Sequence, residues 1–129
     1  MHKITISTNQ KKQIIDITNE VERLISQKNT NIQICYLFIK HTTAALTTAD
    51  LDPGTDLDML DAFSEMMPRL QYRHPHNPSH VVDHILSSII GASVTIPVSN
   101  GSLDLGSWQR IVLVELDGPR LREIIIRFI

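Results

Sequence analysis

The pattern of apolar and polar positions divides the chain into strand-like and helix-like segments. Alternation, or a short apolar run rich in β-branched residues, predicts a strand, whereas apolar positions three and four apart predict a helix. By these criteria we expect strands at residues 4–7, 11–17, 32–39, 93–98, 108–116 and 121–128. We expect helices at residues 19–28, 56–67 and 78–90. A further short strand is expected between the glycines of NGSLDLGSWQ, residues 100–109.

Small polar residues precede each expected helix, and helix-ending residues follow two of them. We expect Asn19 to cap the first helix, Thr55 the second and Asn77 the third, because their side chains can accept a free backbone N–H of the first turn. Pro68 lies just beyond the second helix and Gly91 just beyond the third. These signals fix the expected ends of the helices.

Strands predominate, and the helices are inserted between them without regular alternation. That order favours an α+β fold over a repeated βαβ arrangement. Residues 32–39 are apolar on both expected faces, which is typical of a strand in the middle of a sheet. The chain has 129 residues without a repeat or a linker-like tract, so we expect a single domain over residues 1–129.

Composition and charge exclude several classes of protein. The net charge is −2 and the basic residues do not cluster, which argues against a nucleic-acid partner. No apolar run approaches the ~20 residues that span a bilayer, so no membrane partner is expected. The N-terminus lacks the apolar segment of a secretory signal, and the single cysteine, Cys35, has no internal partner for a disulfide. We therefore expect a cytoplasmic protein in which Cys35 is a small buried apolar residue.

Four of the six histidines lie in YRHPHNPSHVVDH, residues 72–84. Imidazole transfers protons near neutral pH and binds zinc-type metals. His80 and His84 are one helical turn apart, and His41 follows the expected central strand. For any one of these residues, solvation or a bond to a backbone carbonyl is the better explanation. A cluster held between two prolines, however, indicates a binding site.

Acidic residues gather in ADLDPGTDLDMLD, residues 49–61. Asp56 and Asp58 fall in the first turn of an expected helix, where the helix dipole favours carboxylates, so a structural explanation suffices. Asp50 and Asp52 precede that turn and are candidates for binding Mg²⁺ or an organic cation. The spacing is not that of an EF-hand.

Groups suited to phosphate oxygens form a weaker signal, because no Walker loop or GxGxxG motif accompanies them. Trp108 is either a core residue or the flat wall of a pocket for a heteroaromatic ring. The phosphate candidates are Lys40, Thr42, Thr43, Arg73, Ser87, Ser88, Arg110 and Arg120.

Five motifs, in this order, resemble those of the YjbQ family, whose members are called secondary thiamine-phosphate synthases. The glycine–serine–tryptophan–glutamine element is the most specific of them, and the resemblance covers nearly the whole chain from Ile32 onward. The motifs are HTTAALT (41–47), YRH (72–74), HILSSIIGASVTIPV (84–98), NGSLDLGSWQRIVLVE (100–115) and DGPR (117–120).

The resemblance implies a mixed β-sheet curled into a pseudo-barrel, with two or three helices packed on it, and assembly as a homotrimer. It also implies a thiamine-phosphate synthase activity, regarded as weak and secondary. That activity joins a pyrimidine pyrophosphate to a thiazole phosphate and releases pyrophosphate. The expected partner is therefore a phosphorylated small molecule.

The resemblance also implies a histidine-lined site. His41, His74 and His84 match it and are expected as catalytic residues and as ligands of a divalent metal, Zn or Mg. Asp50 is expected as a further catalytic residue, although many members have an Asn-Glu-Asn type sequence there and the aspartate is one methylene shorter than a glutamate. His76 and His80 are less typical of the motif and are left outside the core site. The expected substrate-binding residues are Thr42, Thr43, Ser87, Ser88, Trp108, Gln109, Arg110 and Arg120.

Within the leading hypothesis, Lys40, Arg110 and Arg120 bind the pyrophosphate and Trp108 stacks on a ring. Two alternatives stay open. One is a metal-dependent phosphoester hydrolase, since three imidazoles leave a metal position open for water. The other is a trimeric module that binds a small metabolite or a metal without turning it over.

Overall fold

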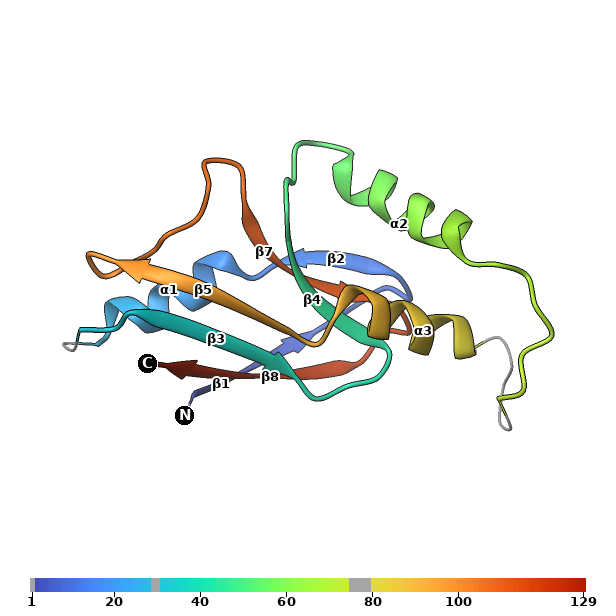
Figure 1. The fold of residues 1–129 in the computed structure, drawn as a ribbon, viewed down its shortest axis with the longest axis horizontal. Coiled ribbons are helices and arrows are strands. Elements are labelled where there is room, and N and C mark those ends of the chain that lie inside the picture. The colour runs from blue at the N-terminus through green and yellow to red at the C-terminus, as the bar shows by residue number, and fades with distance from the viewer. Residues whose placement is uncertain (1, 29–30, 75–79) are drawn as a thin grey trace.

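The computed structural model describes residues 2–28, 31–74 and 80–129, which form two packed β-sheets and three helices (Figure 1). The larger sheet has five strands in the order β1-β8-β3-β5-β6, and the smaller has three in the order β2-β7-β4. Each pair of neighbouring strands runs antiparallel. The strands are β1 (His2–Ser7), β2 (Gln13–Asp16), β3 (Ile34–Ile39), β4 (Ala44–Ala49), β5 (Ser93–Ser99), β6 (Ser102–Leu103), β7 (Arg110–Glu115) and β8 (Leu121–Phe128).

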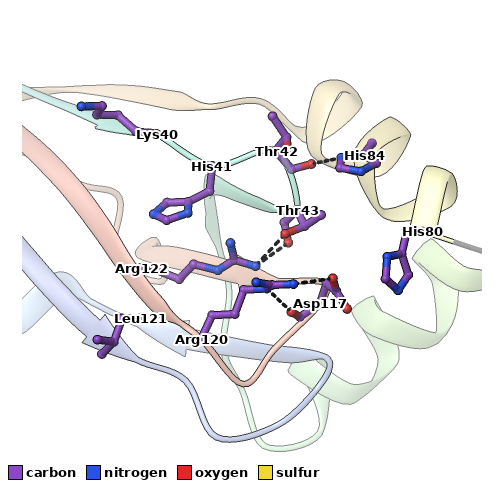
Figure 2. A pocket seen from close by; sticks show the side chains of 10 residues that line it. All are labelled: Lys40, His41, Thr42, Thr43, His80, His84, Asp117, Arg120, Leu121 and Arg122. Carbon is purple, nitrogen blue, oxygen red and sulfur yellow. Dashed lines mark hydrogen bonds and ion pairs between the residues drawn. The ribbon is translucent and has the colours of Figure 1, made fainter. Parts of the chain in front are cut away.

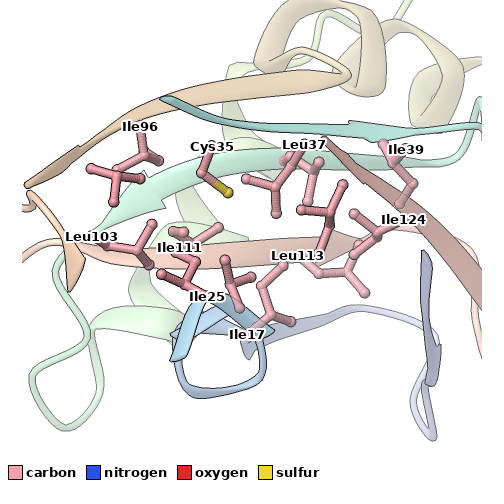
Figure 3. Close-up of a cluster of buried hydrophobic side chains, with 14 of the residues drawn as sticks. Ile17, Ile25, Cys35, Leu37, Ile39, Ile96, Leu103, Ile111, Leu113 and Ile124 are labelled. Carbon is pink, nitrogen blue, oxygen red and sulfur yellow. The ribbon is translucent and has the colours of Figure 1, made fainter. Parts of the chain in front are cut away.

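The main core fills the space between the two sheets (Figure 3). Leu37 of β3 and Ile124 of β8 enter it from the larger sheet, and Ile111 and Leu113 of β7 enter it from the smaller one. Each of these four side chains is fully buried. Burying an aliphatic side chain of this size contributes about 1.5–3 kcal/mol, so the contact between the sheets is a major source of stability.

Strand β7 is buried on both faces, which explains its uninterrupted apolar sequence. Ile111 and Leu113 face the main core, whereas Val112 and Val114 face a second cluster with Leu86 of helix α3. Helix α1 (Thr18–Ser26) packs on the main core, and helices α2 (Thr55–Met66) and α3 (Val81–Ile90) lie on the other side of the small sheet. The α+β fold with a curled sheet and packed helices is therefore confirmed.

The helices match the expected positions, but their expected caps are not the observed ones. Helix α1 starts one residue before Asn19, and the Asp16 carboxylate accepts the Thr18 backbone N–H at 2.9 Å. Thr55 is the first residue of α2, so the N-cap position before it is Gly54, which has φ of 90°. Glycine has no side chain that could cap the helix. The expected cap at Asn77 lies outside the described residues. Gly91 ends α3 as predicted.

Two strand expectations need correction. Strand β4 was not expected, because its sequence AALTTA is short in strongly apolar residues; Ala44 and Ala45 are nevertheless fully buried beside β7. Strand β3 is central in its sheet, as expected, but buries only one face: Cys35, Leu37 and Ile39 point inward, while Phe38 is 36% exposed. None of the described helices has the length and apolar character needed to cross a membrane.

Candidate functional site

A polar pocket of about 650 Å³ opens where β3, β7 and β8 meet the first turns of α3 (Figure 2). The β3–β4 connection supplies the run from Lys40 to Thr43, and the start of β8 supplies the run from Arg120 to Arg122. His80 and His84 reach it from α3, and Asp117 reaches it from the turn after β7. Chain segments about 40 residues apart in sequence thus converge on one cavity.

A buried ion pair lies under the pocket. Arg122 is 1% exposed, and its Nε and Nη2 atoms donate to the two carboxylate oxygens of Glu115, with Nε 2.9 Å from Oε1. Thr8 donates its hydroxyl to Oε1 at 2.7 Å, and the Asp117 backbone N–H reaches Oε2 at 3.2 Å. Burial acts to raise the pKa of Glu115, but these donors outweigh it and hold the pKa below its ordinary value. Glu115 is therefore a carboxylate at neutral pH.

The Arg122 guanidinium is only partly used by the protein. Besides Glu115, its Nη2 atom donates to the carbonyl and the hydroxyl of Thr43, at 3.0 and 2.9 Å. The other terminal nitrogen, Nη1, makes no hydrogen bond with another described residue. Since no fully buried side-chain nitrogen or oxygen in the described ranges lacks a partner, Nη1 must be accessible through the pocket that Arg122 lines. A cationic donor is thus presented at the base of the cavity.

A second arginine, Arg120, lines the same pocket and is held in place by Asp117. Arg120 donates from Nε to the Asp117 carbonyl at 2.8 Å and from Nη2 to the Asp117 carboxylate at 3.1 Å. Lys11 reaches the other carboxylate oxygen at 3.2 Å. Burial acts to raise the pKa of Asp117, but these donors keep it below its ordinary value. With Lys40 also in the lining, the pocket carries an excess of cationic groups.

The tautomer of His41 follows from its backbone contact. Its Nε2 atom accepts the backbone N–H of Glu123 at 3.0 Å, so the neutral ring carries its proton on Nδ1. Burial lowers the pKa of His41, and the neighbouring Arg122 lowers it further, so the ring is neutral at physiological pH. His41 is therefore an uncharged N–H donor beside the cationic floor.

His84 presents the opposite function. Its Nδ1 atom lies 3.0 Å from the carbonyl oxygen of Thr42, which can only accept, so Nδ1 carries a proton. In the neutral ring this leaves the Nε2 lone pair available. His74 stacks on His84 with ring centroids 5.2 Å apart and an interplanar angle of 24°. The structure therefore brings His74 and His84 together, as the sequence analysis expects.

The three expected metal ligands do not form a joint site in this arrangement. No three His, Cys, Asp or Glu side chains in residues 2–28, 31–74 and 80–129 are placed so that they could hold a metal ion. The lone pair of His41 is already used at Nε2, and its Nδ1 bears a proton. Binding a metal there would require the contact with Glu123 to break. A divalent metal bound by these histidines stays a prediction.

Several expected site residues lie away from the pocket lining. Ser87 is buried and donates to the Ala44 carbonyl at 2.6 Å, which ties α3 to β4. Ser88 donates to the His84 carbonyl one turn back in the helix, at 3.1 Å. Asp50 accepts the backbone N–H of Asp52 at 3.2 Å in the turn before α2. These three residues have local structural roles.

The tryptophan-containing segment also lies elsewhere. Trp108 is 74% exposed and is not part of the pocket lining. Gln109 lines a different, smaller pocket and accepts the Gly106 backbone N–H at 2.8 Å. Arg110 pairs with Asp16 at 2.7 Å and with Asn19 at 3.1 Å. Of the expected substrate-binding residues, Thr42, Thr43 and Arg120 line the pocket.

Sequence reasoning missed the buried pair at the base of the site, although a signal was present. Alternation along β8 places Arg122 on the same face as Ile124 and Ile126, and Glu115 ends the continuous apolar run of β7. A charged residue at a position whose neighbours are core residues is expensive unless it is paired. Two such residues of opposite sign, seven positions apart, predict an ion pair.

Comparison with known proteins agrees with this architecture. Residues 2–129 match the family described as UPF0047 protein YjbQ-like. A UPF0047 protein of Archaeoglobus fulgidus is 34% identical over 126 residues, covering 97% of this chain and 98% of the relative. The UPF0047 protein YugU of Bacillus subtilis is 36% identical over 125 residues, covering 96% and 95%.

Solved structures show the same fold. A YjbQ/UPF0047 family protein from Clostridium acetobutylicum superposes with a TM-score of 0.90 at 34% identity, with both chains covered completely. A protein from Aeropyrum pernix gives 0.91 at 32% identity, covering 99% of this chain and 96% of the other. The fold and site thus define a small α+β protein with a cationic, histidine-lined pocket. The chain belongs to the YjbQ (UPF0047) family, as its motifs indicated.

Proposed function

We propose that the pocket binds the phosphate or pyrophosphate group of a small molecule, and that the protein is a transferase acting by loss of pyrophosphate. The observation that carries the proposal is the free Nη1 atom of Arg122, a buried guanidinium nitrogen open to the pocket. Its position is fixed by four hydrogen bonds, so little conformational entropy is lost when it binds an anion.

The proposed reaction is that of a thiamine-phosphate synthase of low activity. The carbon–oxygen bond of a pyrimidine-methyl pyrophosphate breaks, its electron pair leaves with pyrophosphate, and the thiazole nitrogen bonds to the carbon. Such a step needs little covalent help from the protein, which has to stabilise the leaving charge and hold the two rings in line. Arg120, Arg122 and Lys40 supply positive charge, and His41 supplies a neutral N–H.

We further propose that the protein is a homotrimer located in the cytoplasm. Exposed apolar side chains, among them Met66, Leu70 and Trp108, support burial between copies in a homotrimer. The single buried cysteine supports a cytoplasmic location.

The test compares two arginine variants. Arg122→Lys keeps the positive charge toward Glu115 but removes the second guanidinium arm. Arg110→Lys is the matched control, since Arg110 pairs with Asp16 outside the pocket. Binding of inorganic pyrophosphate is measured by titration calorimetry, and thiamine phosphate formation from the two substrates is followed by fluorescence after oxidation.

We expect Arg122→Lys to weaken pyrophosphate binding about tenfold or more, because a charge-assisted hydrogen bond is worth about 1.5–3 kcal/mol. We expect Arg110→Lys to leave binding unchanged. Equal effects in the two variants would overturn the assignment of the pocket. Pyrophosphate binding without any product would show a non-catalytic binding module, and inorganic phosphate released from either substrate alone would show a hydrolase.

A further inference from the structure

Few apolar residues line the phosphate pocket, although the proposed substrates carry rings. Among its described lining residues the one aliphatic side chain larger than threonine is Leu121, which is 66% exposed. Trp108, the expected ring-stacking residue, is not part of the lining. A ring held beside the phosphate would therefore bury more apolar surface in a mainly apolar cavity outside this pocket.

A second cavity has a volume of about 330 Å³, and most of its surface is apolar. It lies between α2, α3 and the end of β7, and its walls include Leu60, Phe63, Val82, Leu86 and Leu116. Its volume lies at the lower end of the range for small-molecule sites, and it suits one substituted ring.

Side chains of the two linings are in contact. Lys11 lines the apolar cavity and Asp117 lines the phosphate pocket, and Lys11 Nζ lies 3.2 Å from Asp117 Oδ1. The lysine side chain of this ion pair is 61% exposed. Such a bridge is weak and can yield to a ligand.

A buried carboxylate gives the apolar cavity its specificity. Asp83 is 4% exposed and lines the cavity, and its Oδ1 atom accepts from Lys12 at 3.0 Å. Its Oδ2 atom receives no hydrogen bond from another described residue. Since no fully buried side-chain oxygen of the described residues lacks a partner, Oδ2 must be accessible through the cavity. The lining also includes Lys11, Lys12 and Ser64, but most of its surface is apolar, so this acceptor favours a ligand with an N–H donor.

We infer that this cavity is the ring subsite of the phosphate pocket: it takes an aromatic or heteroaromatic ring whose amino group donates to Asp83, while the phosphate of the same molecule binds at Arg122. This rests on the proposed function for the phosphate half. The ligand class is an amino-substituted arylmethyl phosphate, in which one ring carries both groups.

The experiment titrates three compounds, inorganic phosphate, benzyl phosphate and 4-aminobenzyl phosphate, into the full-length protein by calorimetry. We expect benzyl phosphate to bind about tenfold more tightly than phosphate, because the ring enters an apolar cavity. We expect 4-aminobenzyl phosphate to bind more tightly still. Phosphate bound without any gain from the ring would overturn the inference and leave the proposed function standing. A protein that binds none of the three would overturn both.

Two variants and one control locate the subsite. Phe63→Ala should remove most of the gain from the ring and leave phosphate binding unchanged, whereas Leu57→Ala on the same helix, 61% exposed and outside the cavity, should change neither. Asp83→Asn should abolish the preference for the amino compound over benzyl phosphate. A merely structural role of Asp83 would instead weaken both compounds alike, and that result would overturn its assignment. Circular dichroism and thermal melting verify that each variant is folded.

Discussion

Arg122 and Glu115 form a buried ion pair in which Nε lies 2.9 Å from Oε1 and every carboxylate oxygen has at least two donors. The pair connects the end of β7 to the start of β8 across a short turn. It also fixes the guanidinium that faces the pocket. Stability and the proposed binding function therefore depend on the same two residues.

Replacing Glu115 with alanine should destabilise the protein strongly. The substitution leaves Arg122 buried without a counter-charge, which typically costs about 3–5 kcal/mol in the free energy of unfolding. Urea unfolding followed by circular dichroism measures the change. The control is Glu123→Ala, because Glu123 pairs with Lys3 at the surface and such pairs contribute about 1 kcal/mol or less. Similar losses in both variants would show that the buried pair has no special importance.

Stability should fall as the pH is lowered through the acid range. The pKa values of Glu115 and Asp117 are lowered in the folded protein from ordinary values of 4.5 and 3.8. Below these ordinary values the unfolded chain binds more protons than the folded one, so the stabilisation present at neutral pH is lost as pH falls toward the folded-state values. Urea unfolding at intervals from about pH 7 to pH 3 measures the slope. Asp117→Asn should reduce it, and an unchanged slope would contradict the assignment.

Both His41 and His84 should carry their proton on Nδ1 at alkaline pH. Each tautomer is set by one backbone contact, an N–H donor at Nε2 of His41 and a carbonyl acceptor at Nδ1 of His84. Long-range ¹⁵N–¹H correlation spectra at about pH 8 distinguish the tautomers, and spectra in urea give the unfolded reference. Because burial and Arg122 lower the pKa of His41, its ring should also stay neutral to a lower pH than in urea. A proton on Nε2 of His41 would contradict the observed contact.

Cys35 should be unreactive in the folded protein. It is fully buried in the main core, and burial, with a smaller effect from Glu22, raises the pKa of its thiol to about 12. The thiolate is the reactive form, so the native protein should not react with a disulfide reagent at about pH 8 over minutes. The same protein in guanidinium chloride is the positive control. Rapid labelling of the native state would show that the core opens easily.

The role of the buried pair in binding can be tested separately from its role in stability. A protein in which Glu115→Ala is strongly destabilised but Arg122→Lys still binds pyrophosphate normally would have a buried pair that serves the fold alone. Because Nη1 of Arg122 is open to the cavity, we instead expect Arg122→Lys to weaken pyrophosphate binding.

Local pattern was sufficient to place most elements, and its failures have identifiable reasons. The continuous apolar run of β7 and the alternation of β8 predicted both strands, because burial on one or two faces imposes its own period on the sequence. Strand β4 was missed because its alanines are small side chains with little strand preference, and only the close approach of β7 makes that size appropriate. The caps expected at Asn19 and Thr55 are wrong because both residues lie inside the first turn, and Ile17 and Gly54 occupy the N-cap positions.

The sequence by itself determined the succession of strands and helices, the family, and a group of histidines and of residues suited to binding phosphate. Each of these can be recognised from neighbouring positions or short motifs. Only the tertiary structure decided which of those residues share a cavity. Thr43 meets Arg122 across 79 positions, whereas Trp108 and Arg110 lie away from the pocket lining. The physical reason is that a buried charge requires partners from several elements at once, and that requirement is met in space without leaving a regular spacing along the chain.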